Sequence, residues 1–260
     1  MSRPRHILAT FASVLLLCSV AANADDKLKL GTEGAYPPFN YFDTAGNVIG
    51  FDVEIGQALC AKMKVECEVV AQDWDGIIPG LIAKKYDLIV ASMFITADRK
   101  KMVSFTDPYY KSAISLVAPV GSNITDFTSE GMKGKIIGAQ SGTTQAEFAQ
   151  TTYPDADIRL YPTQDEVNLD LVTGRLDLQV GDMLQMLDWV NKTDDGKCCE
   201  LIGSPITDPK FVGEGVGIAV RQEDNDLREA LNKALKEIRD DGTFKAINDK
   251  YFPIDVYTMD

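Results

Sequence analysis

Residues 136–145 read IIGAQSGTTQ, and this stretch decides the class of fold. Residues 136–139 form a short apolar run typical of a buried strand, Gly142 supplies a turn, and a helical pattern begins at Thr143 and continues to Gln150. A strand that passes through a short loop into a helix is the repeating unit of α/β proteins. The stretch therefore predicts an α/β fold.

The same unit recurs along most of the chain. Short apolar runs alternate with helical patterns in two successive series, which predicts largely parallel sheets. The clearest helix is 227–239, where apolar residues from Leu227 to Ile238 recur at steps of three and four. The expected strands are 27–32, 67–71, 88–92, 114–119, 136–139, 158–161, 178–181 and 216–220. The expected helices include 51–62, 76–84, 143–150, 166–173 and 227–239.

Two of these strands separate the two series. Strands 114–119 and 216–220 lack a long helix after them, and they bracket a middle segment with its own β/α series. We expect them to cross between two lobes, so that hinge bending is confined to a few backbone torsions. Lobe 1 is then discontinuous, built from residues 25–116 plus 215–260, and lobe 2 is residues 117–214.

Residues 1–24 are expected to be an export signal that is cleaved near Ala24. Two arginines precede an apolar run over 7–20, and residues 22–24, ANA, form a small-x-small cleavage site. A membrane anchor is disfavoured because the run is shorter than the roughly 20 apolar residues of a spanning helix. Lipidation at Cys18 is a minor alternative, since Leu17 stands where a lipobox has a small residue. We therefore expect an exported protein.

Charge and histidine content exclude several classes of function. The whole chain has a net charge of -13, and its one histidine, His6, lies in the predicted signal. A strongly acidic protein repels nucleic acid and anionic membrane surfaces, so neither is an expected partner. Without a histidine after residue 24, Ser-His and Cys-His catalysis and histidine metal sites are excluded. We expect no cofactor and no metal.

Four cysteines remain after the signal, in a compartment that permits disulfides. Cys60 and Cys67 flank a tight helix-to-strand turn and are the expected pair. Cys198 and Cys199 are adjacent, and the sequence leaves open whether they are bridged to each other, paired elsewhere or free. The spacing of the four matches no zinc pattern.

Four loops at the ends of expected strands carry candidate binding residues. Ligands bind at the carboxyl ends of parallel strands in open α/β sheets. Each loop also has a plain structural interpretation: a proline-rich turn at 31–39, a core aromatic at 72–76, a surface ion pair at 91–99 and a simple helix cap at 138–145. The candidates in these loops are Glu33 and Tyr36, Trp74, Arg99, and Thr143 with Thr144.

Because the four loops come from both lobes, we expect them to face each other across a cleft. Arg99 and the helix terminus at Thr143 and Thr144 are suited to clamp one carboxylate from two sides. Asp182, at the end of strand 178–181, is placed to receive an ammonium group. Together these groups describe a site for an amino-acid zwitterion.

The chain resembles the polar and basic amino-acid binding proteins of ABC importers, a periplasmic family that includes lysine/arginine/ornithine, histidine and opine binders. The resemblance covers essentially all of the chain after the signal and rests on several motifs in order. These are GFDVE (50–54), WDGIIP (74–79), ITxxR (95–99), FTDPY (105–109), GTTQ (142–145), GRLD (174–177) and DGTF (241–244). The resemblance implies the two-lobed periplasmic-binding-protein, or Venus-flytrap, fold.

The resemblance also implies residue roles. Arg99, the Phe94 amide and Thr144 match the α-carboxylate site, and Asp182 with the Ala91 carbonyl matches the α-ammonium site. Tyr36 and Trp74 resemble the aromatic pair around the ligand side chain, and Glu33 falls where basic-amino-acid binders carry an acidic residue. The expected ligand-binding residues are Glu33, Tyr36, Asp52, Trp74, Ala91, Ser92, Phe94, Arg99, Gln140, Thr143, Thr144, Gln145 and Asp182.

One departure from the family bears on the ligand. Phe94 stands where many relatives have a small hydroxyl residue that helps to hold the ammonium, whereas Glu33, Trp74 and residues 168–171 look like the opine-binding subgroup. The expected function is capture of a basic amino acid for an ABC permease by a monomeric, non-enzymatic protein. An opine binder is the alternative ligand class, and a periplasmic dehydratase of the same fold or a sensor module is the alternative kind of protein.

Overall fold

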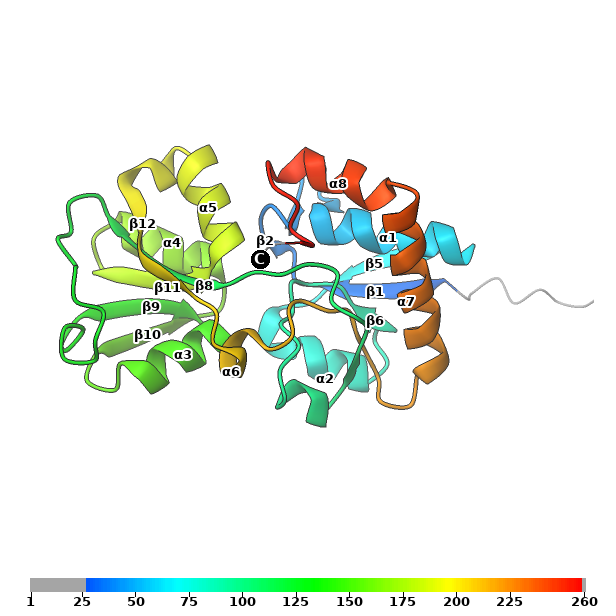
Figure 1. Cartoon of the computed structure of the whole chain (residues 1–260), viewed down its shortest axis with the longest axis horizontal. Coiled ribbons are helices and arrows are strands. Elements are labelled where there is room, and N and C mark those ends of the chain that lie inside the picture. Colours follow the sequence, from blue (N-terminus) through cyan, green and yellow to red (C-terminus); the bar gives the residue numbers. More distant parts are fainter. Residues whose placement is uncertain (1–26, 259–260) are drawn as a thin grey trace, which may run out of the picture.

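The computed structural model describes residues 27–258, so the predicted export signal lies outside the described residues. Within this range the chain forms two lobes, each built around a five-stranded sheet (Figure 1). The strands are β1 Leu28–Thr32, β2 Ala35–Tyr36, β3 Asn40–Phe42, β4 Val48–Ile49, β5 Cys67–Ala71, β6 Leu88–Ile89, β7 Ser104–Phe105, β8 Ile114–Pro119, β9 Ile136–Gln140, β10 Asp157–Tyr161, β11 Leu178–Asp182, β12 Cys199–Ile206 and β13 Ala219–Val220. The helices are α1 Phe51–Met63, α2 Ile77–Ile82, α3 Thr144–Thr152, α4 Gln164–Val172, α5 Met183–Lys192, α6 Pro209–Val212, α7 Asn225–Asp240 and α8 Thr243–Tyr251.

The first lobe is built on the sheet β5-β1-β6-β13-β7. β1 pairs in parallel with both β5 and β6, whereas β13 is antiparallel to β6 and β7. α1 buries Phe51, Ile55 and Leu59, and it packs against α7 and α8. Sequence periodicity predicts the buried face of α7 correctly, because Leu231 and Leu235 both lie in the core. The carboxyl ends of β1 and β6 therefore stand at one edge of a well-supported sheet.

The second lobe is built on the sheet β10-β9-β11-β8-β12. β9 lies between β10 and β11 and is parallel to both, and β8 is antiparallel to β11 and β12. α3, α4 and α5 pack on this sheet. Both sheets are mixed: β13 in the first sheet and β8 in the second run opposite to their neighbours, and each of these strands follows a crossover between the lobes.

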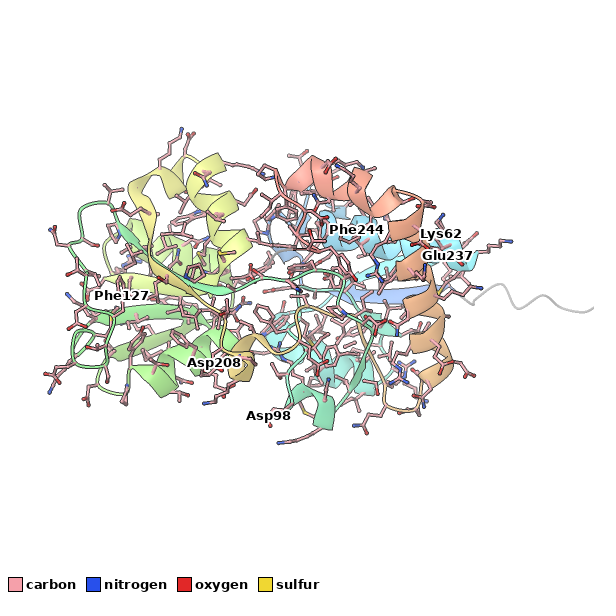
Figure 2. All side chains as sticks on the ribbon, in the orientation of Figure 1. Lys62, Asp98, Phe127, Asp208, Glu237 and Phe244 are labelled. Carbon is pink, nitrogen blue, oxygen red and sulfur yellow. A yellow bond between two sulfur atoms is a disulfide. The ribbon has the colours of Figure 1, made fainter. Side chains whose placement is uncertain are left out.

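Two segments of chain connect the lobes (Figure 1). Residues 111–113 lead from an isolated bridge at Tyr110 into β8, and residues 207–215 lead from β12 to Val216, which bridges both Phe94 and Tyr110. The short helix α6 lies in the second crossing, where the Asp208 carboxylate (labelled in Figure 2) accepts a hydrogen bond from the Lys210 amide at 2.9 Å. Two connections between the lobes are found, as expected. They lie just before the predicted strands 114–119 and 216–220 and not within them, and all of β8 belongs to the second sheet. The lobe boundaries at 116 and 215 stay a prediction.

The expected strands and helices all appear, although strand 88–92 is shortened to β6 and strand 216–220 to β13. The sequence does not predict α5, α8, β12 or the small sheet β2-β3-β4. The structure pairs Cys60 with Cys67, as predicted, and pairs Cys198 with Cys199, which the sequence had left open. No helix within 27–258 is long and apolar enough to cross a membrane.

Candidate functional site

A cavity lies between the two lobes. Its walls come from the loops after β1 and β6, from the turn that follows β5, and from the end of β9 with the start of α3. Ten of the thirteen predicted ligand-binding residues line it: Glu33, Tyr36, Trp74, Ala91, Ser92, Phe94, Arg99, Gln140, Thr143 and Gln145. The cavity thus lies at the carboxyl ends of parallel strands, where α/β sheets hold their ligands.

Arg99 brings a buried positive charge to this cavity. Its residue is only 8% exposed, its Nη1 donates to the Phe94 carbonyl at 3.0 Å, and its guanidinium lies 5.3 Å from the centre of the Trp74 ring. Burial lowers the pKa of Arg99 to about 10. Among residues 27–258, no carboxylate lies within ion-pair distance of this guanidinium. The charge of Glu147 offsets the effect of burial only in part, and a buried cation without a direct ion-pair partner is unfavourable, so the site is suited to an anionic group.

Glu33 places a carboxylate in the same cavity. It is 8% exposed, and its Oε1 accepts a hydrogen bond of 2.6 Å from Gln140 Nε2 of the other lobe. Burial raises the pKa of Glu33 to about 7, against the lowering effect of the Gln140 hydrogen bond, and the charge of nearby Asp165 raises it further. A bound cation would favour the ionised carboxylate, so Glu33 is suited to a positively charged group.

Direct contacts between the lobes surround the cavity. Besides the pair of Glu33 and Gln140, the Ser141 hydroxyl lies 3.0 Å and 2.9 Å from the two carboxylate oxygens of Asp75. Gly142 has φ +65°, and a side-chain carbon there would lie 2.9 Å from Asp75 Oδ1 and 3.5 Å from the Trp74 ring. The absence of a side chain at Gly142 therefore allows the close approach of the two lobes.

Three predicted site residues lie outside the cavity lining: Asp52, Thr144 and Asp182. Thr144 is the first residue of α3, directly after the cap residue Thr143, whose Oγ1 accepts from the Ala146 amide at 3.1 Å. Its backbone amide lies in the first turn of the helix, where amides lack helical partners. The start of α3 thus lies directly next to Thr143, which lines the cavity.

Asp182 and Asp52 are buried carboxylates behind the cavity. Asp182 caps α5: its Oδ1 accepts hydrogen bonds from the amides of Leu184 at 2.9 Å and Gln185 at 3.3 Å, and from the Ser112 hydroxyl at 2.8 Å. Burial raises the pKa of each of the two carboxyls to about 6, and each has compensating hydrogen bonds. Each carboxylate therefore holds neighbouring groups in place through hydrogen bonds and also contributes negative charge near the cavity.

Sequence reasoning missed several residues that complete the site. Asp75 and Ser141 join the lobes, Ser112 bonds Asp182, and Asp165 raises the pKa of Glu33. Asp75 and Ser141 both lie in the predicted strand-end loops 72–76 and 138–145. Their place in these loops is the signal by which the sequence indicates that they lie near the site. That they meet each other depends on how far the lobes close, which no local pattern specifies.

The fold is that of a two-lobed binding protein, and a buried cation and a buried carboxylate in one cavity are suited to a small zwitterion. Residues 28–254 match the family model for bacterial extracellular solute-binding proteins, family 3, and the chain belongs to this family. It is 43% identical over 247 residues to the L-arginine-binding protein of Pseudomonas aeruginosa, with 94% of each chain covered. It is 38% identical to the lysine/arginine/ornithine-binding periplasmic protein of Escherichia coli, with 94% of this chain and 96% of that protein covered.

Solved structures show the same similarity. An ancestral arginine-binding protein bound to arginine superposes with a TM-score of 0.80 at 35% identity, covering 87% of this chain and 98% of that one. An ancestral amino acid-binding protein, a precursor of cyclohexadienyl dehydratase, superposes with a TM-score of 0.78 at 29% identity, covering 87% and 95%. The neighbours thus include amino-acid binders and the precursor of an enzyme.

Proposed function

We propose that this protein captures a basic amino acid in the cavity between its lobes and delivers it to an ABC importer. The observation that carries the proposal is the presence of a buried, unpaired Arg99 and a buried Glu33 in one cavity. A basic amino acid at neutral pH has a carboxylate for the first and a cationic side chain for the second. The relatives named for binding arginine, lysine and ornithine support the same ligand class.

Each end of the ligand has its own set of groups. Arg99, the Phe94 amide and the α3 terminus at Thr144 would hold the α-carboxylate, because a bidentate guanidinium and free helix amides both favour anions. Asp182 and the Ala91 carbonyl would hold the α-ammonium. Glu33 would receive the distal cation, and Tyr36 and Trp74 would contact the aliphatic part of the side chain.

Capture would proceed by closure of the lobes about the two crossings. We place lobe 1 at residues 25–116 plus 215–260 and lobe 2 at residues 117–214. The hydrogen bonds of Glu33 with Gln140 and of Asp75 with Ser141 would then form only in the closed state. Such a closed state is the species for an importer to recognise, and we expect a monomeric, periplasmic protein whose export signal has been removed.

We assign no catalysis to the site. The similarity to a dehydratase precursor concerns a protein that is itself named as an amino-acid binder, and the closely related proteins are binders. The groups available for proton transfer at this cavity are Glu33 and Tyr36, and both have proposed binding roles. Turnover of prephenate or arogenate by the purified protein would overturn this assignment.

The test is thermal unfolding of the ligand-stripped protein in the presence of arginine, lysine, ornithine, histidine, glutamine, glutamate, octopine or nopaline. A ligand that binds only the native state raises the unfolding midpoint. We expect large shifts with one or more of the basic amino acids and little shift with glutamate. A shift with the opines alone would move the assignment to opine binding, and no shift with any of these compounds would refute the proposed site.

A further inference from the structure

Asp52 is the most deeply buried carboxylate next to the proposed site, with 0% of the residue exposed. Its hydrogen-bond donors in the structure are all neutral. Asn40 Nδ2 and Ser92 Oγ each donate to Oδ2 at 2.9 Å, and the Tyr109 hydroxyl donates to Oδ1 at 2.5 Å. Asp52 also lies in the first turn of α1, where the helix dipole favours a negative charge. These donors and the helix dipole favour the ionised carboxylate and partly offset burial, which raises the pKa of Asp52 to about 6.

These donors connect Asp52 to three segments of the first lobe. Asn40 Oδ1 accepts the Gly34 amide at 2.8 Å and so ties Asp52 to the loop that carries Glu33. Ser92 belongs to the loop that carries Arg99, and Tyr109 precedes the first crossing. Asp52 therefore organises the cavity from behind without lining it.

Ser92 is the member of this network that reaches the cavity. Its φ is +51°, a left-handed conformation that non-glycine residues seldom adopt and that costs free energy unless surrounding contacts hold it. The hydrogen bond to Asp52 is such a contact. Because Ser92 lines the cavity, the conformation at this one residue directs both its hydroxyl and the adjacent Ala91 carbonyl.

The direction of the hydrogen bond also fixes the chemistry of the hydroxyl. A serine hydroxyl has one proton, and Ser92 gives that proton to Asp52. Toward the ligand, Ser92 Oγ can then only accept. An acceptor next to an ionised carboxylate selects an N–H group, and above all a cationic one.

We expect the α-ammonium to be the ligand group nearest to this acceptor. Arg99 Nη1 donates to the Phe94 carbonyl, so the guanidinium lies against the same turn, residues 91–94, that contains Ser92. The α-carboxylate and the α-ammonium are bonded to one carbon atom. A carboxylate held by Arg99 therefore brings the ammonium close to Ser92.

We propose that Asp52 is a positioning residue that keeps Ser92 left-handed and orients its hydroxyl as an acceptor for the α-ammonium of the ligand. This inference rests on the proposed function, because it concerns the recognition of an amino-acid ligand. It assigns no ligand contact to Asp52 itself. It gives Ser92 a role that Ala91 and Phe94, which have no side-chain hydroxyl, cannot fill.

The experiment compares two ligands on Asp52→Asn. The ligands are L-arginine and 5-guanidinopentanoate, which is arginine without its α-amino group, and affinities are measured by calorimetry or by competition. The asparagine amide offers donors where the carboxylate accepted, so the Ser92 hydroxyl turns away from its acceptor role. We expect arginine affinity to fall about tenfold or more, as for a hydrogen bond to a charged group, and analogue affinity to change much less. L-lysine with 6-aminohexanoate provides a second pair of the same kind.

Ser92→Gly keeps the proposal testable if Asp52→Asn folds poorly. Glycine adopts φ +51° without strain but has no hydroxyl, so it removes the acceptor and keeps the backbone. We expect it to reduce the preference for arginine over the analogue as Asp52→Asn does, with little added loss in the double variant. Asp194→Asn, at a side chain that is 95% exposed, is the matched control for loss of one carboxylate.

Two results overturn the inference. Equal weakening of arginine and the analogue in Asp52→Asn would show that Asp52 supports the site as a whole and not the ammonium. Independent, additive losses in the double variant would show that Asp52 does not act through Ser92. If the wild-type protein bound neither arginine nor lysine, the proposed function would be wrong, and the inference would fall with it.

Discussion

Glu33 Oε1 of the first lobe lies 2.6 Å from Gln140 Nε2 of the second, so a side chain proposed to hold the ligand also joins the lobes. The Gln140 amide nitrogen donates in addition to the Pro162 carbonyl at 3.1 Å. A carbonyl can only accept, so this second bond fixes the orientation of the amide group. Closure and recognition of a cationic side chain therefore depend on the same carboxylate.

This relationship predicts how ligand binding changes with pH. The pKa of Glu33 in the unliganded cavity is raised to about 7, and a cation is bound by the ionised form. As the pH falls below 7, a growing fraction of Glu33 must lose a proton before the cation binds. We expect affinity for a basic amino acid to fall about fivefold between about pH 7 and about pH 6.

Calorimetry across this range measures the effect, and Glu33→Gln is its control. The variant should bind more weakly at pH 8 and show a much flatter pH profile. Below about pH 6 the protonation of Asp52 and Asp182 contributes as well, so the comparison belongs above that value. A wild-type profile that stays flat between pH 6 and 8 would show that Glu33 does not meet a cation.

The ligand-free protein should lose stability as the pH rises. Burial raises the pKa values of Glu33, Asp52 and Asp182 from ordinary values near 4 to about 7, 6 and 6. Between the unfolded and folded pKa values the native state binds more protons than the unfolded chain, so its free energy of unfolding falls with rising pH. We expect a decrease of a few kcal/mol between about pH 4.5 and about pH 7.

Chemical denaturation at several pH values measures this decrease. Glu33→Gln should remove the share of the decrease that occurs closest to neutral pH and leave the shares that come from Asp52 and Asp182. Constant stability over the window would mean that the three carboxyls are not buried together in the ligand-free state, as in an open conformation.

Arg99→Met should affect stability and binding in opposite directions. It replaces a buried, unpaired cation by an apolar side chain of similar length, which we expect to stabilise the ligand-free protein by roughly 1 kcal/mol or more. It also removes the proposed carboxylate partner, and we expect ligand affinity to fall at least about 100-fold. Unfolding midpoints with and without ligand measure both effects. The exposed neighbour gives the control Lys100→Met, and a destabilised Arg99→Met with retained binding would contradict the assignment.

Ser141→Ala should weaken the closed state modestly. It removes the hydroxyl that bonds both carboxylate oxygens of Asp75, and this pair is exposed to solvent. We expect ligand dissociation to accelerate about two- to fivefold, with little change in association, because the contact forms on closure. Stopped-flow tryptophan fluorescence is a suitable measurement because Trp74 lines the cavity. A change confined to the association rate would place the contact before closure.

Replacing Cys60 and Cys67 by serine should lower stability without altering the ligand preference. The bridge closes a short loop between α1 and β5, and the loop-entropy relation gives a loss of about 2.5 kcal/mol. Cys60 lies in the core of the first lobe, so the serine hydroxyl adds to the loss. Denaturation of the double variant measures the difference. A changed order of ligand affinities would connect the bridge with the site.

The sequence predicts the fold well where local patterns and the core agree. The helix at 227–239 was recognised because its apolar spacing matches the face that packs in the core of α7. β12 was missed because Gly203 and Pro205 interrupt its pattern, and the structure shows a register irregularity between Ile202 and Ile206. The sequence analysis does not predict α5. It treats Asp182 only as a ligand group, whereas in the structure Asp182 is also the N-cap residue of this helix.

The site was predictable as a set of residues but not as a set of contacts. Strand ends and motif order brought ten of the predicted residues to one cavity. The position of Asp52 behind Ser92, and of Asp182 at the start of α5, depends on packing between segments that are 40 and 70 residues apart in the chain. Local sequence patterns do not encode such distances, so the sequence does not predict that Asp52 and Asp182 lie outside the residues that line the cavity.

Gly142 makes the closed form of this protein sensitive to one small mutation. Any other residue there would be strained at φ +65°, and its side chain would also displace the Asp75 carboxylate, whose Oδ1 would lie 2.9 Å away. A substitution at Gly142 would therefore change the stability of the closed form, and with it the affinity, while every side chain proposed to hold the ligand stays in place. Natural selection, or a designer of amino-acid biosensors, can use this position to adjust affinity without changing ligand preference.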